Sequence, residues 1–392
     1  MGLIAHFSPA LPAAAEAPET GPQAPAAASA VTAACATVDN YLLYPDDMLN
    51  ERIAAARARL GERVIVLGHH YQRDEVVRFA DCRGDSLQLA RQAAASRAQT
   101  IVFCGVHFMA ESADILRQPH QRVILPDLQA GCSMADMAEI EQVEIAWEQL
   151  ERLHLAEEVA PITYINSSAA IKAFCGRRGG LVCTSSNAAR ALRWAWQRKP
   201  RVLFLPDQHL GRNTAHALGV ELDRMAVWDP RQDFGGNAWD HLRQSQILLW
   251  KGHCSVHARF RPEHVDEVRR RHPGTRVVVH PECPLEVVQK ADLAGSTEFI
   301  IRQIETAPAG SQWAIGTEVH LVNRLAHEHP RLAIHHLDSA GCPWCSTMYR
   351  ISPQHLCWVF EELVAGRVVN PVEVASPDRE AARMALDRML EV

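Results

Sequence analysis

One pattern occurs three times along this chain of 392 residues: an apolar strand with a polar tip, a helix, a second helix opened by Ser or Thr, and another apolar strand. The copies run over residues 63–106, 161–208 and 275–319. Short apolar runs that alternate with helices are typical of parallel strands buried on both faces. The repeat therefore predicts an α/β protein made of three similar three-layer αβα units with parallel sheets.

The repeat also suggests a domain organisation. We expect units over residues 41–132, 133–254 and 255–345. Residues 1–40 are rich in Ala and Pro, which break helices and offer little to bury, so we expect a disordered extension that includes Cys35. Residues 346–392 are expected to form a helical segment that packs back on the core, since the stretch 353–363 carries apolar residues at helical spacing.

Polar residues follow the first strand of each copy, and hydroxyl residues open the second helix. Ligands of parallel sheets bind beyond the carboxyl ends of the strands, and helix starts offer N–H groups and a positive dipole end to anions. His69 and His280 occupy corresponding strand tips, and Ser86, Ser185 and Thr297 stand at the helix starts. Capping alone explains one such hydroxyl, but three in register favour an anion site.

Composition narrows the class of protein. The net charge of −6 and the lack of a long basic run argue against a nucleic-acid partner. The chain has neither a signal-peptide pattern nor an apolar stretch of about 18 residues, so we expect no membrane span. Eleven cysteines, an odd number, indicate reduced thiols in a cytoplasmic protein rather than a disulfide framework.

Three cysteines stand out because each follows the last strand of one copy: Cys132, Cys254 and Cys345. They lie more than 90 residues apart, whereas a structural zinc site takes four ligands, usually in short-spaced pairs. Three separated thiolates fit a 4Fe–4S cluster with one iron free of protein ligands better. Zinc stays as the weaker alternative, and Cys342 with Cys345 forms a C-x-x-C pair that suggests a redox disulfide.

The motifs around these residues resemble the quinolinate synthase (NadA) family. The similarity extends from about Val64 to Leu363, in family order, and includes "HHYQRDE", "GDSLQLA", "TYINSSAAIKA", "HCSVHARF", "HPECPLEV" and "CSTMYRI". It implies three α/β units arranged with pseudo-threefold symmetry around a central cavity. It also implies a 4Fe–4S cluster at the floor of that cavity, held by Cys132, Cys254 and Cys345.

The resemblance further implies a reaction and a binding site. Family members condense iminosuccinate with dihydroxyacetone phosphate to give quinolinate, phosphate and water in NAD biosynthesis. An L-aspartate oxidase that supplies iminosuccinate is an expected partner, and the chain is expected to be a monomer or a homodimer. Tyr71 matches a tyrosine used in the chemistry, and Ser186 is an alternative to Ser185. The substrate-binding positions fall on His69, Ser86, Tyr164, Asn166, Ser185, His280, Glu282 and Thr297.

The chemistry of such a site suggests individual roles. We expect Glu282 to act as general base and Tyr71 as proton donor or shuttle, with His69 and His280 binding carboxylate or carbonyl oxygens. Two other functions remain as alternatives: an aconitase-like 4Fe–4S hydro-lyase, and a non-enzymatic iron–sulfur carrier or redox sensor. The cavity hydroxyls and the pair of His280 and Glu282 argue against a carrier, which has no use for them.

Overall fold

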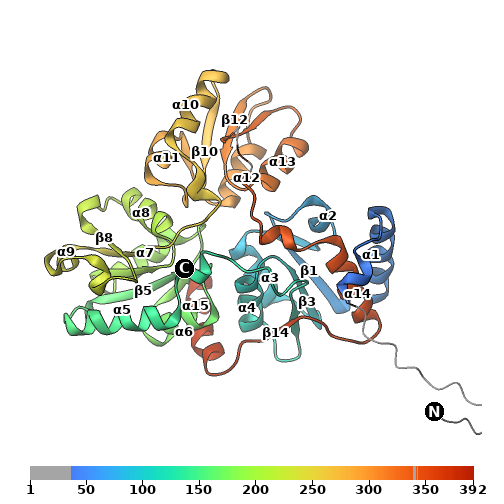
Figure 1. Cartoon of the computed structure of the whole chain (residues 1–392), viewed down its shortest axis with the longest axis horizontal. Helices are drawn as coiled ribbons and strands as arrows, with labels where there is room; N and C mark the ends of the chain where they lie inside the picture. Colours follow the sequence, from blue (N-terminus) through green and yellow to red (C-terminus); the bar gives the residue numbers. More distant parts are fainter. Residues whose placement is uncertain (1–36, 339–340, 342) are drawn as a thin grey trace, which may run out of the picture. The chain divides into compact units, whose positions relative to one another are not determined.

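Three separate β-sheets organise the computed structural model, which describes residues 37–338, 341 and 343–392 (Figure 1). Residues 1–36 of the expected extension, including Cys35, lie outside the described residues, and so does Cys342, the second thiol of the C-x-x-C pair. Helices flank each sheet, so the predicted α/β class with three αβα units is confirmed. The pseudo-threefold arrangement and the unit boundaries at residues 132, 254 and 345 stay predictions.

The first sheet has the strand order β14-β4-β3-β1-β2. Its four N-terminal strands pair in parallel, and β14 adds an antiparallel edge from the far end of the chain. Its strands are β1 (Val64–His69), β2 (Cys82–Gly84), β3 (Thr100–Cys104), β4 (Arg122–Ile124) and β14 (Pro371–Val372), and its helices are α1 (Asp46–Leu60), α2 (Asp74–Val77), α3 (Ser86–Ala95) and α4 (His107–Leu116), with short 3-10 turns η1 (Val38–Tyr41) and η2 (Gly61–Arg63).

The second sheet has the order β6-β5-β7-β9-β8, and every pairing is parallel. Its strands are β5 (Val159–Tyr164), β6 (Leu181–Cys183), β7 (Arg201–Leu205), β8 (Met225–Trp228) and β9 (Ile247–Trp250). The helices of this part are α5 (Ile140–Arg152), α6 (Ala169–Arg177), α7 (Ala188–Trp196), α8 (Gln208–Ala217) and α9 (Trp239–Gln244), with 3-10 turns η3 (Ala135–Met137), η4 (Ala156–Glu158), η5 (Leu222–Arg224) and η6 (Asp233–Gly236).

The third sheet has four parallel strands in the order β11-β10-β12-β13. They are β10 (Arg276–Val279), β11 (Leu293–Ala294), β12 (Gln312–Gly316) and β13 (Ala333–His336). The accompanying helices are α10 (Pro262–Arg271), α11 (Leu285–Lys290), α12 (Thr297–Glu305) and α13 (Val319–Glu328), with the turns η7 (His257–Arg259) and η8 (Met348–Arg350) before and after them.

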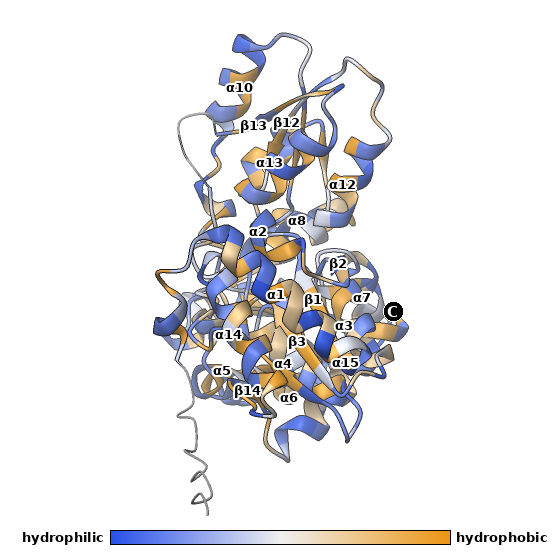
Figure 2. Cartoon of the chain, turned by 90° about the vertical axis from the view of Figure 1, so that its right-hand side faces the viewer, coloured by the Kyte–Doolittle hydropathy of each residue, from blue (hydrophilic) through white to orange (hydrophobic). Residues whose placement is uncertain are grey.

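The apolar core of the third sheet is separate from the core that the other two sheets share. One continuous buried cluster runs through the first and second sheets, whereas the third has its own clusters on its two faces. The alternation is visible on β10, where Val277 and Val279 belong to one cluster and Val278 to the other, as expected for a strand buried on both sides. Figure 2 shows the apolar residues gathered along the strands and on one side of many helices.

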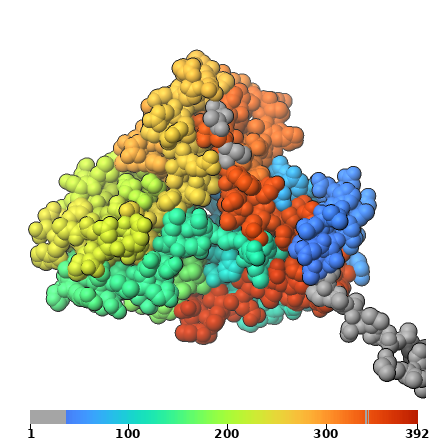
Figure 3. All heavy atoms as spheres, in the orientation of Figure 1, coloured from blue at the N-terminus to red at the C-terminus, as the bar shows by residue number. Residues whose placement is uncertain are grey.

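The C-terminal segment returns to both earlier sheets. Helix α14 (Pro353–Val364) packs against α1, and α15 (Asp378–Glu391) packs against α6. Figure 3 shows this red segment at the surface beside the blue start of the described chain. None of the helices in the part of the chain described here has the length and apolar character that crossing a membrane requires.

The contact between α6 and α15 leaves no room for a side chain at Gly176. A Cβ there would lie 1.8 Å from the carbonyl oxygen of Ala381 on α15. We predict that Gly176→Ala lowers the free energy of unfolding by about 1–3 kcal/mol, because the two helices must separate. Circular dichroism during thermal unfolding measures this loss. Gly131→Ala is the matched control, since nothing lies within 4 Å of its added Cβ; an equal loss in both variants would contradict the prediction.

Candidate active site

One cavity collects the polar tips of all three sheets. All of the site residues expected from the sequence line it: His69, Tyr71 and Ser86 beside the first sheet, Tyr164, Asn166 and Ser185 beside the second, His280, Glu282 and Thr297 beside the third, and Cys132, Cys254 and Cys345. Most of them lie at or just beyond strand ends or at helix starts, which is where parallel sheets place their ligands. The fold therefore brings together residues that are far apart in the chain.

Helix starts contribute to the cavity in two of the three copies. Ser86 opens α3 behind the capping side chain of Asp85, and Thr297 opens α12 behind that of Ser296. In the second copy the expectation was less accurate, because α7 begins at Ala188 after a turn that contains Ser185. The Ser185 position still lines the cavity, but as part of a turn rather than of a helix.

The choice between Ser185 and Ser186 follows from a contact between sheets. The Ser186 hydroxyl donates a 2.5 Å hydrogen bond to Asp85, whose other carboxylate oxygen caps α3 by accepting from the Gln88 N–H. Ser186 does not line the cavity, whereas Ser185 does. The geometry thus favours Ser185 as the residue that meets a ligand.

Glu282 is the buried centre of the polar network. The Tyr164 hydroxyl donates to one of its carboxylate oxygens at 2.6 Å, and the His257 Nδ1 lies 2.7 Å from the other. His280 Nδ1 lies 3.9 Å from that second oxygen. Burial disfavours the charged carboxylate, but the imidazoles of His280 and His257 and the Tyr164 hydroxyl hold the pKa of Glu282 below its ordinary value. Glu282 is therefore an ionised acceptor in the cavity.

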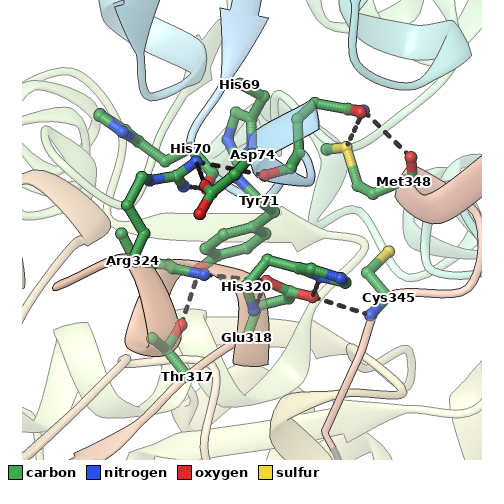
Figure 4. Close-up of polar contacts among 12 residues, drawn as sticks. His69, His70, Tyr71, Asp74, Thr317, Glu318, His320, Arg324, Cys345 and Met348 are labelled. Carbon is green, nitrogen blue, oxygen red and sulfur yellow. Dashed lines mark hydrogen bonds and ion pairs between the residues drawn. The ribbon is translucent and has the colours of Figure 1, made fainter. Parts of the chain in front are cut away.

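Tyr71 approaches the same network from the first sheet (Figure 4). Its hydroxyl lies 2.8 Å from Thr317 Oγ1 and 3.1 Å from Thr297 Oγ1. Thr317 Oγ1 in turn lies 3.0 Å from His257 Nε2. Burial first, and then the charge of Glu282, raises the pKa of Tyr71, so the phenol keeps its proton. A continuous polar path runs from Tyr71 to Glu282.

Two residues on this path, His257 and Thr317, were not predicted from the sequence. His257 follows the candidate ligand Cys254 in "HCSVHARF", and Thr317 comes directly after β12. The polar residues that follow the last strand of a copy reach the same edge of the sheet as those that follow the first strand. This is the sequence signal that indicates Thr317, directly after β12.

The three expected ligand cysteines converge on the cavity. Burial raises the pKa of Cys254 most, and the charge of Glu282 and the neighbouring thiols of Cys132 and Cys345 raise it further. Such a group is unfavourable as three free thiolates and suits a bound cation or cluster. The residues present therefore fit an iron–sulfur cluster.

A second donor set shares one of these thiols. The ligand atoms of Cys254, His257 and Glu282 all lie within 4.8 Å of one another, close enough to hold a single metal ion. His257 and Glu282 are also engaged with Thr317 and Tyr164, however, so a metal would compete for their lone pairs. A cluster bound by Cys132, Cys254 and Cys345 would leave the contacts of His257 and Glu282 unchanged.

Comparison with known proteins decides the family. The family model described as "Quinolinate synthetase A protein" matches residues 51–391. The chain belongs to the quinolinate synthase family. A quinolinate synthase of Acidobacterium capsulatum is 62% identical over 94% of this chain and 99% of its own length. Those of Nocardioides sp. and Corynebacterium glutamicum are 59% and 54% identical, over 88% and 90% of this chain and 89% and 90% of their own.

Membership in the quinolinate synthase family settles the alternatives in function. The chain is an enzyme of this kind, serving NAD biosynthesis, and an iron–sulfur cluster is consistent with the family. The aconitase-like hydro-lyase and the non-enzymatic iron–sulfur protein are therefore not supported.

His70, next to His69, does not line the cavity and gives a prediction of pH dependence. Burial, with the positive charges of Arg324 and Arg83, lowers the pKa of His70 to about 3 from an ordinary 6.5. The neutral ring fits the folded state, so its contribution to stability is complete above pH 6.5 and is lost as the pH falls towards 3. The free energy of unfolding of the parent should fall between pH 7 and pH 5 by about 2 kcal/mol more than that of His70→Gln.

Chemical denaturation at the two pH values measures the effect. The exposed His120 provides the matched control, because His120→Gln makes the same chemical change without burial. A parental pH dependence in His70→Gln would show that this ring is not the one that takes up a proton on unfolding.

Proposed function

We propose that this protein condenses iminosuccinate with dihydroxyacetone phosphate, forming quinolinate and releasing phosphate and water. One observation carries the proposal: hydroxyls, imidazoles and a carboxylate from three sheets line the same cavity as three thiols. Both substrates are small, oxygen-rich anions that need many neutral donors and an electrophile. A cavity of this composition offers the donors, and its three thiols would hold a cluster that supplies the electrophile.

Cys132, Cys254 and Cys345 would hold a 4Fe–4S cluster that has one iron without a protein ligand. When bound, such an iron supplies a Lewis acid that polarises a carbonyl or a departing hydroxyl. Thr347 lies 3.3 Å from the sulfur of Cys345, and the Cys345 N–H donates to Glu318 at the same distance. These contacts fix the orientation of the third thiol.

Anionic substrates would be bound without a basic field. No Lys or Arg occurs among the described residues that line the cavity. Ser86 and Thr297 present hydroxyls at helix starts, where the free N–H groups and the dipole favour carboxylate or phosphate. The buried Asn166 Oδ1 has no partner within the protein, which marks this amide as a candidate for binding substrate. His69 and His280, both buried, would bind carboxylate or carbonyl oxygens.

Proton transfer would use the path between Tyr71 and Glu282. Tyr71 retains its proton and can donate it, and Thr317 can pass a proton between Tyr71 and His257. His257 is oriented by Glu282, so the imidazole and the carboxylate would act together as the proton acceptor. Glu282 thus keeps the role of base expected from the sequence, with His257 as its partner.

The setting of the reaction follows from its chemistry. Iminosuccinate is the product of oxidising the amine of aspartate to an imine, and we propose an L-aspartate oxidase as the supplier. We also propose that the enzyme works in the cytoplasm, as a monomer or a homodimer.

The decisive experiment is an anaerobic assay of the reconstituted enzyme with both substrates, detecting quinolinate and phosphate. We predict that Glu282→Gln keeps the cluster but lowers turnover about 100-fold or more, because the proton acceptor is lost. Glu286→Gln changes an exposed carboxylate four residues away and should retain turnover. Near-parental turnover in Glu282→Gln would remove this residue from the mechanism, and no quinolinate from the parent would remove the function.

The proposed ligand set makes a separate prediction. Cys254→Ala should lose the cluster, seen as loss of bound iron and acid-labile sulfide together with the visible absorption. Cys104→Ala is the matched control, because Cys104 is a buried thiol in β3 that does not line the cavity. Equal iron and sulfide in Cys254→Ala and the parent would contradict the ligand set, and iron without sulfide would point instead to a single ion.

A further inference from the structure

We propose that Glu111, Asn213 and Arg324 form a cyclic set of positioning residues, in which each sheet unit holds the polar tip of the next. Arg324 positions Tyr71 and Asn213 positions Glu282. The inference rests on the roles of Tyr71 and Glu282 in the proposed function. It concerns residues that do not line the cavity themselves.

Arg324 on α13 holds the loop that carries Tyr71. Its guanidinium donates to the backbone carbonyls of His70 and Gln72, which flank Tyr71, and to the Asp74 carboxylate at 3.1 Å (Figure 4). Only 5% of Arg324 is exposed. A buried guanidinium needs all of its donors satisfied, and its planar fork suits adjacent carbonyl oxygens. The contact crosses from the third sheet to the first.

Asn213 on α8 makes the corresponding contact from the second sheet to the third. Its side-chain amide donates to the carbonyls of Pro281 at 2.8 Å and Cys283 at 2.7 Å, the two residues that flank Glu282. Asn213 is buried, with 6% exposed. In both cases a side chain donates hydrogen bonds to the backbone carbonyls on either side of a cavity residue. These bonds hold the backbone of that residue in place without contacting its functional atoms.

Glu111 on α4 closes the cycle from the first sheet to the second. Its carboxylate accepts from the Ala169 N–H at 3.1 Å, at the start of α6 and just beyond the tip with Tyr164 and Asn166. The three helices that carry these positioning residues are equivalent in the repeat, since α4, α8 and α13 directly follow β3, β7 and β12. Each unit thus uses the same helix to hold the next unit.

The polar path needs such a device because apolar packing does not align the third sheet with the others. Its clusters are separate from the shared cluster of the first and second sheets, and Tyr71 packs at the edge of both. The bond between Tyr71 and Thr317 crosses this division. Thr317 and Arg324 lie on one continuous segment, so Arg324 sets the position of the Tyr71 backbone relative to the partner of its hydroxyl.

Hydrogen–deuterium exchange of the holoenzyme tests the assignment of each residue to its tip. Arg324→Met should raise exchange about tenfold or more in the segment 69–74 and leave 280–284 at the parental rate. Asn213→Asp, which cannot donate, should do the reverse. The control is Arg83→Met, since Arg83 and Glu328 form an exposed pair at 3.0 Å between β2 and α13, the same two units that Arg324 joins.

Kinetics test the action through Tyr71. Arg324→Met should lower kcat about tenfold or more with a smaller change in KM, because a displaced donor impairs the chemical step. In a Tyr71→Phe background the same substitution should cost less than about twofold, since residues that act through one another are not additive. Bound iron should stay parental in all variants. If Arg324→Met does not fold, Arg324→Lys keeps the charge but not the fork and should change exchange and kcat in the same direction.

The outcomes separate the inference from the proposed function. Parental exchange at both tips, or equal loosening of both by each variant, would overturn the positioning set. Additive losses of kcat would overturn the action of Arg324 through Tyr71. Tip-specific loosening with parental turnover in Tyr71→Phe would support the positioning set and reject the proposed role of Tyr71.

Discussion

The polar path from Tyr164 through Glu282, His257 and Thr317 to Tyr71 is the constraint on which the cavity depends, because its hydrogen bonds and the close contact of Glu282 with His257 join all three sheets. Tyr164, Glu282, His257 and Thr317 are buried and Tyr71 is partly buried, so their polar groups need partners, several of which another unit supplies. Burial normally pushes carboxylates towards the neutral form, but here two imidazoles and a phenol keep Glu282 charged. The path therefore combines structural satisfaction of polar groups with a poised arrangement of proton donors and acceptors.

A protein with a net charge of −6 has no overall positive field to attract the acidic substrates proposed for it. The cavity instead offers local hydrogen-bond donors, which are helix starts, hydroxyls and neutral imidazoles. Burial lowers the pKa of His280 to about 3 and that of His69 well below its ordinary value, so both rings are neutral at physiological pH. Each can then donate from one nitrogen and accept at the other, which suits the carbonyl and carboxylate groups of the proposed substrates.

The residues that line the cavity could be predicted from the sequence, whereas most of the contacts between them could not. Strand tips and helix starts such as His69, His280 and Thr297 could be found because they recur at equivalent points of the repeat and because parallel strands end at one edge. Contacts between side chains of different units could not be found in this way, because they depend on how sheets far apart in the chain are placed. The contact of Ser186 with Asp85 decided which serine lines the cavity, and no local pattern indicates it.

The same limit applies to the fold. The parallel strands follow from apolar runs between helices, but β14 is two residues long and pairs antiparallel with β4, a pairing that only the return of the C-terminal segment allows. The start of α7 at Ala188 depends on Asn187, whose side chain accepts from the Thr184 N–H and so closes a turn where a helix was expected. In both places a tertiary or turn contact outweighs local propensity.

The separation of the apolar clusters has a consequence for how this enzyme maintains its geometry. Burial of apolar surface stabilises each part strongly but without direction, whereas hydrogen bonds are directional and contribute little net stability. The third sheet carries Glu282, Thr297 and Thr317, yet the buried members of its clusters all come from residues 260–337 and only the partly buried Tyr71 joins them from the first sheet. Its alignment therefore falls to directional contacts such as those of Asn213 and Arg324, and the positions of Tyr71 and Glu282 can be sensitive to substitutions that hardly change the stability of the fold.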